Sequence, residues 1–200
     1  TWLGQTTYFA TGPKGELDLL LGIEADRMAR VLIPESDVEA ERGAVLTEMH
    51  GYENDPMTVL QDYVLYLSFL AHPYRNNTIG WESDVASIEH AELVDFYTRH
   101  YHPGNAVLAV VGDVRVPEVL DQVRRHFGSL EGRAPSPRPR TVEPPQRGER
   151  RIRLQGPVQR NHFKIAWRAP AVHSPDFPAF LVLQELLAGG SGVSFLQNDW

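Results

Sequence analysis

Residues 36–52 restrict the fold most, because they combine the spacing of an amphipathic helix with two acids on its apolar side. The apolar stripe of this helix is formed by Val38, Val45, Met49 and Tyr52. On a wheel of about 100° per residue, Glu41 and Glu48 fall on the same arc as that stripe. An unpaired carboxylate facing a core is costly or becomes protonated, so the fold must give both acids a polar setting.

Two interpretations of these acids remain open from the spacing alone. Each glutamate could pair with an arginine at the rim of the core or cap a neighbouring element. Alternatively, two like charges in one pocket repel unless a cation or a proton lies between them, which predicts a metal or acid/base site. The repetition of the acid two helical turns later favours the second interpretation.

Composition excludes several classes of protein. The chain has 200 residues, no cysteine and a net charge of −7, with 42% apolar residues. This describes an ordinary globular protein long enough for one large domain or two small ones. Disulfides, zinc fingers and thiol nucleophiles are excluded. The acidic balance argues against a nucleic-acid partner, and no apolar run reaches the 18 or more residues of a membrane helix.

Periodicity divides the chain into alternating helices and strands. Helical spacing is found in residues 16–30, 36–52, 56–70, 89–101, 117–127 and 176–188. Alternating or continuous β-branched and apolar runs predict strands at residues 5–11, 106–111, 151–155 and 162–167. Residues 71–83 read as a loop, and Ser36 to Glu39 has the form of a capping box. The glycines at 189, 190 and 192 predict a flexible turn, and a phosphate loop there is disfavoured because GK[ST] is absent.

A Pro- and Arg-rich stretch separates two parts of unequal length. Residues 129–150 carry few large apolar side chains, which predicts a solvated linker. Its arginines lack the interleaved aromatic residues that base stacking requires. We therefore expect the C-terminal part of a first domain at residues 1–128, a linker at 129–150, and the start of a second domain at 151–200.

Histidines are the other candidate metal ligands. His100 and His102 have a spacing that could chelate a metal on a strand, but they lie at the predicted end of a helix. A capping or packing role is favoured for both. The remaining histidines are scattered, and we expect loop or surface positions for them: His50, His72, His90, His126, His162 and His173.

Short segments in order along the chain resemble the pitrilysin/insulinase-type zinc metallopeptidases, which include the mitochondrial processing peptidases. They are TTYF at residues 6–9, EADRM at 24–28, ERGAVLTE at 41–48, HPY at 72–74, IGW at 79–81, HYHPGNA at 100–106, VGDV at 111–114 and LAGG at 187–190. No single segment decides the match. The ordered set extends over nearly the whole chain apart from the linker.

The resemblance implies a fold and a role for each acid. The implied fold class is α+β, with helices layered on a mainly antiparallel sheet, and a peptidase domain followed by the start of a homologous pseudo-repeat. In such enzymes an H-x-x-E-H helix supplies two histidine ligands and a glutamate base, and a later E-(x)6-E helix supplies the third zinc ligand. Glu48 matches that ligand, and Glu41 matches its companion, which holds the site polar and oriented.

The chain departs from the family pattern in one respect: H-x-x-E-H occurs nowhere in its 200 residues. We expect that motif upstream of Thr1, and we expect this chain alone to be inactive and not to hold Zn²⁺ stably, because catalytic zinc needs three protein ligands. The resemblance implies a zinc metalloendopeptidase acting on peptides or unfolded polypeptides. The alternative is a non-catalytic homologue that serves as a scaffold or regulatory subunit. A homo-oligomer or a paired homologous subunit is compatible with either.

Overall fold

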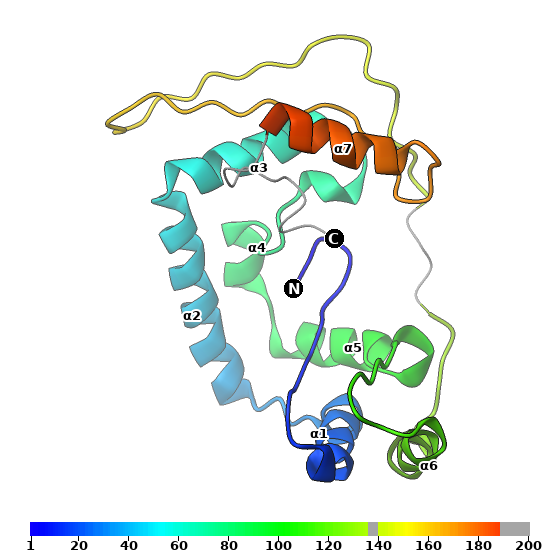
Figure 1. Ribbon diagram of the computed structural model, residues 1–200. Helices are drawn as coiled ribbons and strands as arrows, with labels where there is room; N and C mark the ends of the chain where they lie inside the picture. Colours follow the sequence, from blue (N-terminus) through cyan, green and yellow to red (C-terminus); the bar gives the residue numbers. More distant parts are fainter. Residues whose placement is uncertain (136–139, 189–200) are drawn as a thin grey trace. The chain divides into compact units, whose positions relative to one another are not determined.

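The computed structural model describes residues 1–135 and 140–188. Its α-helices are Leu17–Arg30 (α1), Glu35–Glu53 (α2), Pro56–Ser68 (α3), Glu82–Ser87 (α4), His90–His100 (α5), Val116–Phe127 (α6) and Phe177–Ala188 (α7), labelled in Figure 1. Short 3₁₀ turns lie at Lys14–Glu16, Pro73–Arg75 and Pro103–Asn105. In the described part of the chain, no helix is both long and apolar enough to span a membrane.

Every helix predicted from periodicity is present, with ends within two residues of those expected. The turn between α2 and α3 is built by side chains, because the Asp55 carboxylate accepts hydrogen bonds from the Met57 and Thr58 amides and Pro56 opens α3. The Thr58 hydroxyl also donates to this carboxylate, at 2.7 Å. That bond and the amide bonds lower the pKa of Asp55. Helix α4 was missed, since the sequence of residues 71–83 read as a loop that runs into its first turn.

The predicted capping box at the start of α2 is wrong. Helix α2 begins one residue earlier than expected, after Pro34, and no side chain caps it. The Ser36 hydroxyl instead donates to the adjacent Asp37 carboxylate. A reciprocal cap occurs on α5, where the Glu92 carboxylate accepts from the backbone N–H of Glu89 at 2.9 Å.

The predicted antiparallel sheet is also wrong for the described residues, which form helices and irregular segments and no strand. The segments expected as strands leave large apolar side chains exposed, among them Phe9, Val107, Val111, Phe163 and Trp167. A strand is defined by backbone hydrogen bonds to a neighbour, and none of these segments pairs with another. Alternating β-branched residues indicate a local preference for extended backbone. This preference alone does not form a strand when no neighbouring segment pairs with it.

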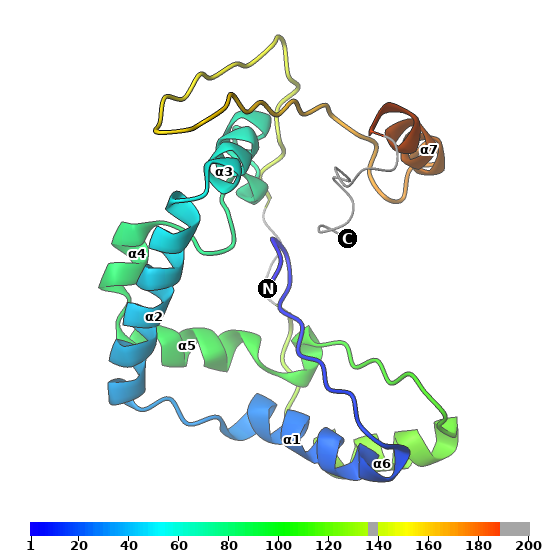
Figure 2. The ribbon, with the colours of Figure 1, turned by 60° about the vertical axis from the view of Figure 1, so that its left-hand side comes forward.

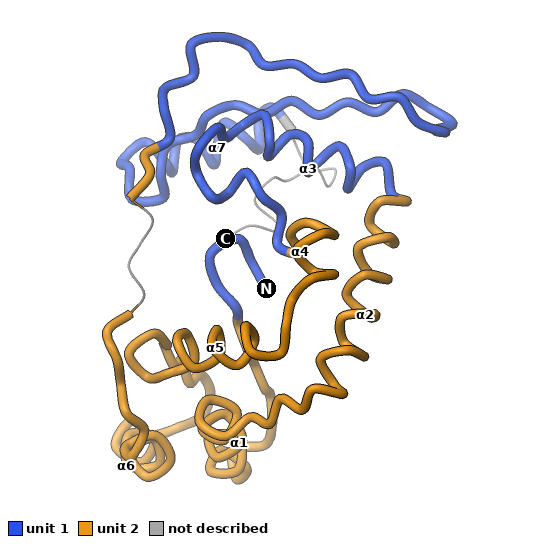
Figure 3. The backbone as a smooth tube through the Cα atoms, turned by 180° about the vertical axis from the view of Figure 1, so that it is seen from behind, with its two compact units in different colours: residues 1–6, 55–78, 143–200 blue, residues 7–54, 79–142 orange. Residues whose placement is uncertain are grey.

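The chain folds into two compact units, each assembled from separate stretches of sequence (Figure 3). Unit 1 contains residues 1–6, 55–78 and 143–200, and unit 2 contains residues 7–54 and 79–142. The domain boundaries expected from composition, at 128 and 150, remain a prediction. The predicted glycine turn at 189–192 lies outside the described residues.

Unit 2 is held by two helix pairs. Helices α1 and α6 lie side by side in Figures 1 and 2, and the Asp18 carboxylate of α1 accepts from His126 of α6 at 3.0 Å and from Arg125 at 3.1 Å. The His126 hydrogen bond is the main cause of the lowered pKa of Asp18. Helix α2 packs on α4, and the buried apolar side chains of the unit are Leu21, Ala25, Val38, Met49 and Val85.

The segment after α5 also packs tightly within unit 2. His102 is 4% exposed, and its Nδ1 accepts from the Arg133 amide at 3.3 Å. A Cβ on Gly104 would lie 2.0 Å from the Arg133 carbonyl oxygen, so only glycine allows this approach. Residues 102–104 and 133 therefore form a close backbone contact.

Unit 1 is organised around α3 and the aromatic residues that follow it. The rings of Phe69, His72 and Tyr74 contact one another, with centroids 4.5 to 6.1 Å apart. The later part of the unit is tied to α3 by long side chains. Lys164 donates to the Gln61 side chain at 2.7 Å, and Arg168 donates to the Ser68 carbonyl at 3.3 Å.

Candidate metal-ligand face on helix α2

The two predicted site residues, Glu41 and Glu48, are both exposed on α2. The prediction that both acids lie on the core-facing stripe is therefore wrong for this structure. The stripe that is buried or half-buried contains Val38, Arg42, Val45 and Met49. The acids lie on its flank, where helical geometry still places them on one side, two turns or about 10.5 Å of rise apart.

Neither glutamate forms an ion pair with any residue that the structure describes. Glu48 accepts a hydrogen bond from the Tyr52 hydroxyl at 2.7 Å, one turn further along α2. This bond and the charge of the carboxylate raise the pKa of Tyr52. The alternative of a structural pair with an arginine at the core rim is not seen within residues 1–135 and 140–188.

The arginine nearest in sequence is engaged elsewhere. Arg42 forms an ion pair with Glu39 and donates to the Ile88 carbonyl, which follows α4. Its half-buried side chain thus joins α2 to the end of α4. Arg42 is therefore committed to packing within unit 2 and pairs with neither Glu41 nor Glu48.

The described residues do not by themselves fit a catalytic zinc ion. Three protein ligands and an open position are required, and no group of three or more histidine, aspartate or glutamate side chains gathers anywhere in the described ranges. The α2 face offers the carboxylate of Glu48, with that of Glu41 two turns away. It can contribute one ligand to a site whose other ligands come from elsewhere.

His50, His100 and His102 take the surface or packing positions expected for them, whereas His90, expected in a loop or at the surface, is the half-buried first residue of α5. His50 is exposed and lies 3.4 Å from the Glu82 carboxylate. His100, the last residue of α5, stacks on Phe96 with ring centroids 4.3 Å apart. His102 is buried against Arg133, and its Nε2 has no hydrogen-bond partner among the described residues. The chelating interpretation of the His100–His102 pair therefore gains no support.

A residue that the sequence reading missed is Glu143. Its carboxylate accepts from three successive backbone amides, those of residues 70 (2.8 Å), 71 (2.8 Å) and 72 (2.9 Å), and lies 3.2 Å from the Arg168 guanidinium. We call this arrangement the Glu143 latch. Burial alone would raise the pKa of Glu143, but these hydrogen bonds and Arg168 lower it from 4.5 to about 2. The only signal in the sequence was an acid within a Pro/Arg-rich stretch.

Comparison with known proteins decides the family. The family model described as the Peptidase M16 inactive domain matches residues 87–198, more than half of the chain. The chain belongs to the M16 peptidase family. The resemblance drawn from the sequence is thereby confirmed.

Two of the relatives with curated names match almost the whole chain. Zinc protease PqqE of Helicobacter pylori is 29% identical over 97% of this chain, and an uncharacterized zinc protease of Mycobacterium leprae is 30% identical over 96%. The chain spans 44% of the length of each of these two relatives. The human mitochondrial-processing peptidase subunit beta is 32% identical over 62% of the chain and 25% of its own length.

Solved structures of proteases resemble the chain in three dimensions as well. The crystal structure of a protease from Helicobacter pylori superposes with a TM-score of 0.63 and 28% identity, covering 66% of this chain and 33% of that one. The periplasmic protease PqqL from Escherichia coli gives a TM-score of 0.58 at 25% identity, over 69% of this chain and 15% of that one. The shared arrangement is thus found among proteases.

Proposed function

We propose that this chain is part of an M16 zinc metalloendopeptidase that cleaves peptides or unfolded polypeptides, with Glu48 as one zinc ligand. The observation that carries the proposal is the pair of exposed acids on one side of α2, without a cationic partner in the described residues, in a chain of a family whose named members are zinc proteases. A carboxylate that its own chain leaves without a cationic partner is available to a metal.

The roles of the two acids differ. Glu48 has one oxygen fixed by the Tyr52 hydroxyl, which orients the carboxylate and leaves its other lone pairs free. Glu41 makes no hydrogen bond within the described residues, and we assign it to keeping the face anionic and orienting its neighbours. Bound zinc would supply polarisation of the scissile carbonyl and an activated water. The chain's own contribution is to hold one ligand in place.

Activity of two proteins tests the proposal. The full-length protein should hydrolyse an unfolded peptide in a chelator-sensitive reaction, whereas the 200-residue chain with added zinc should not. The reason is that the described residues supply one ligand where three are needed. Zinc-dependent hydrolysis by the 200-residue chain would contradict this assignment, and so would chelator-resistant hydrolysis by the full-length protein.

A second function, a scaffold or regulatory subunit paired with an active homologue, is favoured by two observations. The family model that matches residues 87–198 is that of an inactive M16 domain, and the name of one relative designates a subunit. The retention of both Glu41 and Glu48 favours the catalytic assignment, because a scaffold has no need of unpaired acids on one face. Stoichiometric zinc in the purified full-length protein distinguishes the two.

A further inference from the structure

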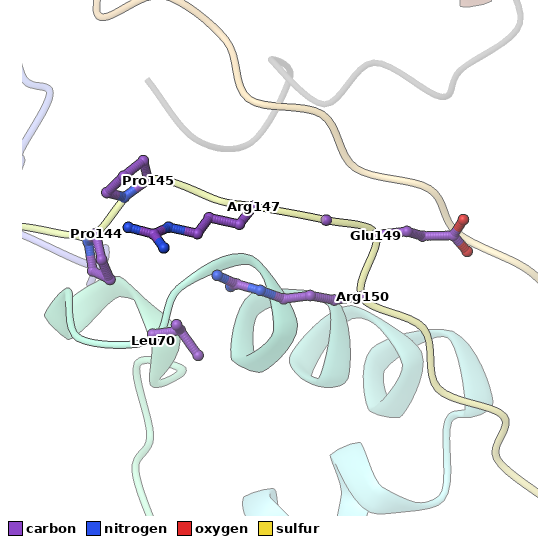
Figure 4. Close-up of a pocket in the computed structure, with 7 residues that line it drawn as sticks. Leu70, Pro144, Pro145, Arg147, Glu149 and Arg150 are labelled. Atoms are coloured by element: carbon purple, nitrogen blue, oxygen red, sulfur yellow. The ribbon is translucent and has the colours of Figure 1, made fainter.

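A hollow of about 490 Å³ lies in unit 1, where the segment around residue 147 passes the end of α3. Figure 4 shows the residues that line it: Leu70, Pro144, Pro145, Arg147, Gly148, Glu149 and Arg150. Its volume is in the range of sites that hold small molecules or short peptide segments. The proposed function assigns no role to this hollow.

Arg147 is the most available charge in the hollow. Its side chain is exposed, and its guanidinium has no hydrogen-bond or ion-pair partner in the described part of the chain. In Figure 4 it extends along the hollow toward Pro144 and Pro145. A guanidinium presents a planar set of donors that matches the two oxygens of a carboxylate.

Arg150 points the same way and is held in place. Its Nη1 donates to the Leu67 carbonyl at 2.6 Å, near the end of α3, and its side chain is half-buried. The remaining donors of this guanidinium are available beside those of Arg147. Glu149, the acid of the hollow, points away in Figure 4 and lies 3.9 Å from Arg151. The two arginines therefore make the hollow positive within a chain whose net charge is −7.

The walls of the hollow are apolar and fixed. Leu70 is 54% exposed, and Pro144 and Pro145 supply rigid rings. The Glu143 latch immediately precedes these prolines and binds the amide of Leu70 itself. The latch thus joins the two walls of the hollow before any ligand arrives, which reduces the entropy lost on binding. The repulsion that Glu143 exerts on an anion in the hollow is reduced, because its carboxylate is bonded to three amides and paired with Arg168.

From this arrangement we propose that the hollow binds an acidic side chain of an extended polypeptide, with Arg147 and Arg150 on the carboxylate and Leu70 and the prolines on neighbouring apolar residues. This inference rests on the proposed function in that the polypeptide would be a peptidase substrate. It adds a preference for acidic residues, which unit 1 would recognise.

Binding of a dye-labelled peptide to the full-length protein tests the proposal by fluorescence anisotropy. The probe contains glutamate among leucine, proline and alanine, and its matched partner carries glutamine in place of glutamate. A chelator is present throughout, so hydrolysis does not contribute. We expect the glutamate peptide to bind about five-fold more tightly at low salt, as for a partly exposed ion pair. The preference should shrink as salt is added.

Two variants locate the effect. Arg147→Gln should abolish the preference for the glutamate peptide, whereas the matched variant Arg151→Gln should preserve it, because Arg151 is 87% exposed and lies outside the hollow. Circular dichroism verifies that both variants are folded. An unchanged preference in Arg147→Gln would overturn the proposal. So would inorganic phosphate that displaces the peptide at equal concentration, since the hollow would then bind simple anions.

The peptide-binding test and the test of zinc-dependent hydrolysis can fail separately. If the full-length protein proves inactive but keeps the Arg147-dependent preference, the proposed peptidase function fails while the acidic-peptide site stands. If hydrolysis is zinc-dependent and the preference is absent, the site fails and the proposed function stands.

Discussion

The carboxylates of Glu143 and Glu48 show two opposite uses of the same chemical group. Glu143 has three backbone amides and an arginine around it, and its side chain is 8% exposed. Glu48 is exposed, and the tyrosine one turn along its own helix is its hydrogen-bond partner. The first carboxylate is satisfied by its own chain, and the second keeps most of its binding capacity.

The difference shows how a structural acid can be told from a ligand. A carboxylate surrounded by amides resists protonation and stays anionic in place, so Glu143 stabilises one backbone arrangement. A carboxylate without a cation on an exposed helix face adds little to folding, so Glu48 can be replaced without loss of stability. The predictions below start from this contrast.

Replacing the proposed ligand should have the largest effect. Glu48→Gln in the full-length protein keeps the size of the side chain and removes its charge. We expect loss of bound zinc and of peptide hydrolysis, with little change in melting temperature, measured by metal analysis and thermal denaturation. Full zinc occupancy in this variant would end the assignment of Glu48 as a ligand.

Glu41→Gln should have a smaller effect on the same measurements. A residue that orients a metal site without binding the metal typically contributes about 10- to 100-fold in affinity or activity. Residual zinc should therefore remain in Glu41→Gln at concentrations where Glu48→Gln has none. Equal loss in the two variants would show that both acids bind the metal.

The Glu143 latch should appear as a stability effect that depends on pH. Because its pKa falls from 4.5 to about 2 on folding, the latch contributes fully above pH 4.5, and the contribution is lost as pH falls toward 2. Glu143→Gln should lower the melting temperature by several degrees at neutral pH and flatten its dependence on pH in this window. The exposed control Glu149→Gln should behave as the unmodified protein. If the melting temperatures of Glu143→Gln and Glu149→Gln depended on pH in the same way, the latch would be contradicted.

The smallest effect is expected from Tyr52→Phe, which removes the hydroxyl that orients Glu48. Loss of one such hydrogen bond should weaken zinc binding by about 3- to 10-fold. The same contact can be read spectroscopically, because Glu48 raises the pKa of Tyr52. In Glu48→Gln, an ultraviolet titration should therefore show a tyrosine ionising at lower pH than before. An unchanged titration would mean that the hydrogen bond is absent in solution.

Local spacing was sufficient to predict the long helices and insufficient for the rest of the fold. Helices α1, α2 and α5 follow from apolar residues three and four apart, since their hydrogen bonds are local. Helix α4 was hidden because it has six residues and is stabilised by Val85 packing within unit 2. The strand predictions failed because pairing depends on a distant segment, about which residues 106–111 carry no information.

The candidate site was predicted in part, for the same reason. Helical geometry gave the common side of Glu41 and Glu48, but their exposure depends on what covers the helix. Glu143 could not have been singled out, because its three amide partners lie more than seventy residues earlier in the chain. Contacts between residues so far apart leave no periodic trace in a sequence.

The discontinuity of unit 1 limits how this protein can be cut for study. Because residues 55–78 and 143–200 belong to one unit, a fragment that starts after the Pro/Arg-rich stretch would leave behind the helix to which Lys164 and Arg168 bind. Such a fragment would keep the cations without their acceptors and would lose Glu143 as well. Isotope labelling, crystallisation or binding assays on the second half alone would then examine an incomplete surface. Boundaries for recombinant pieces are better chosen so that α3 and Glu143 stay together.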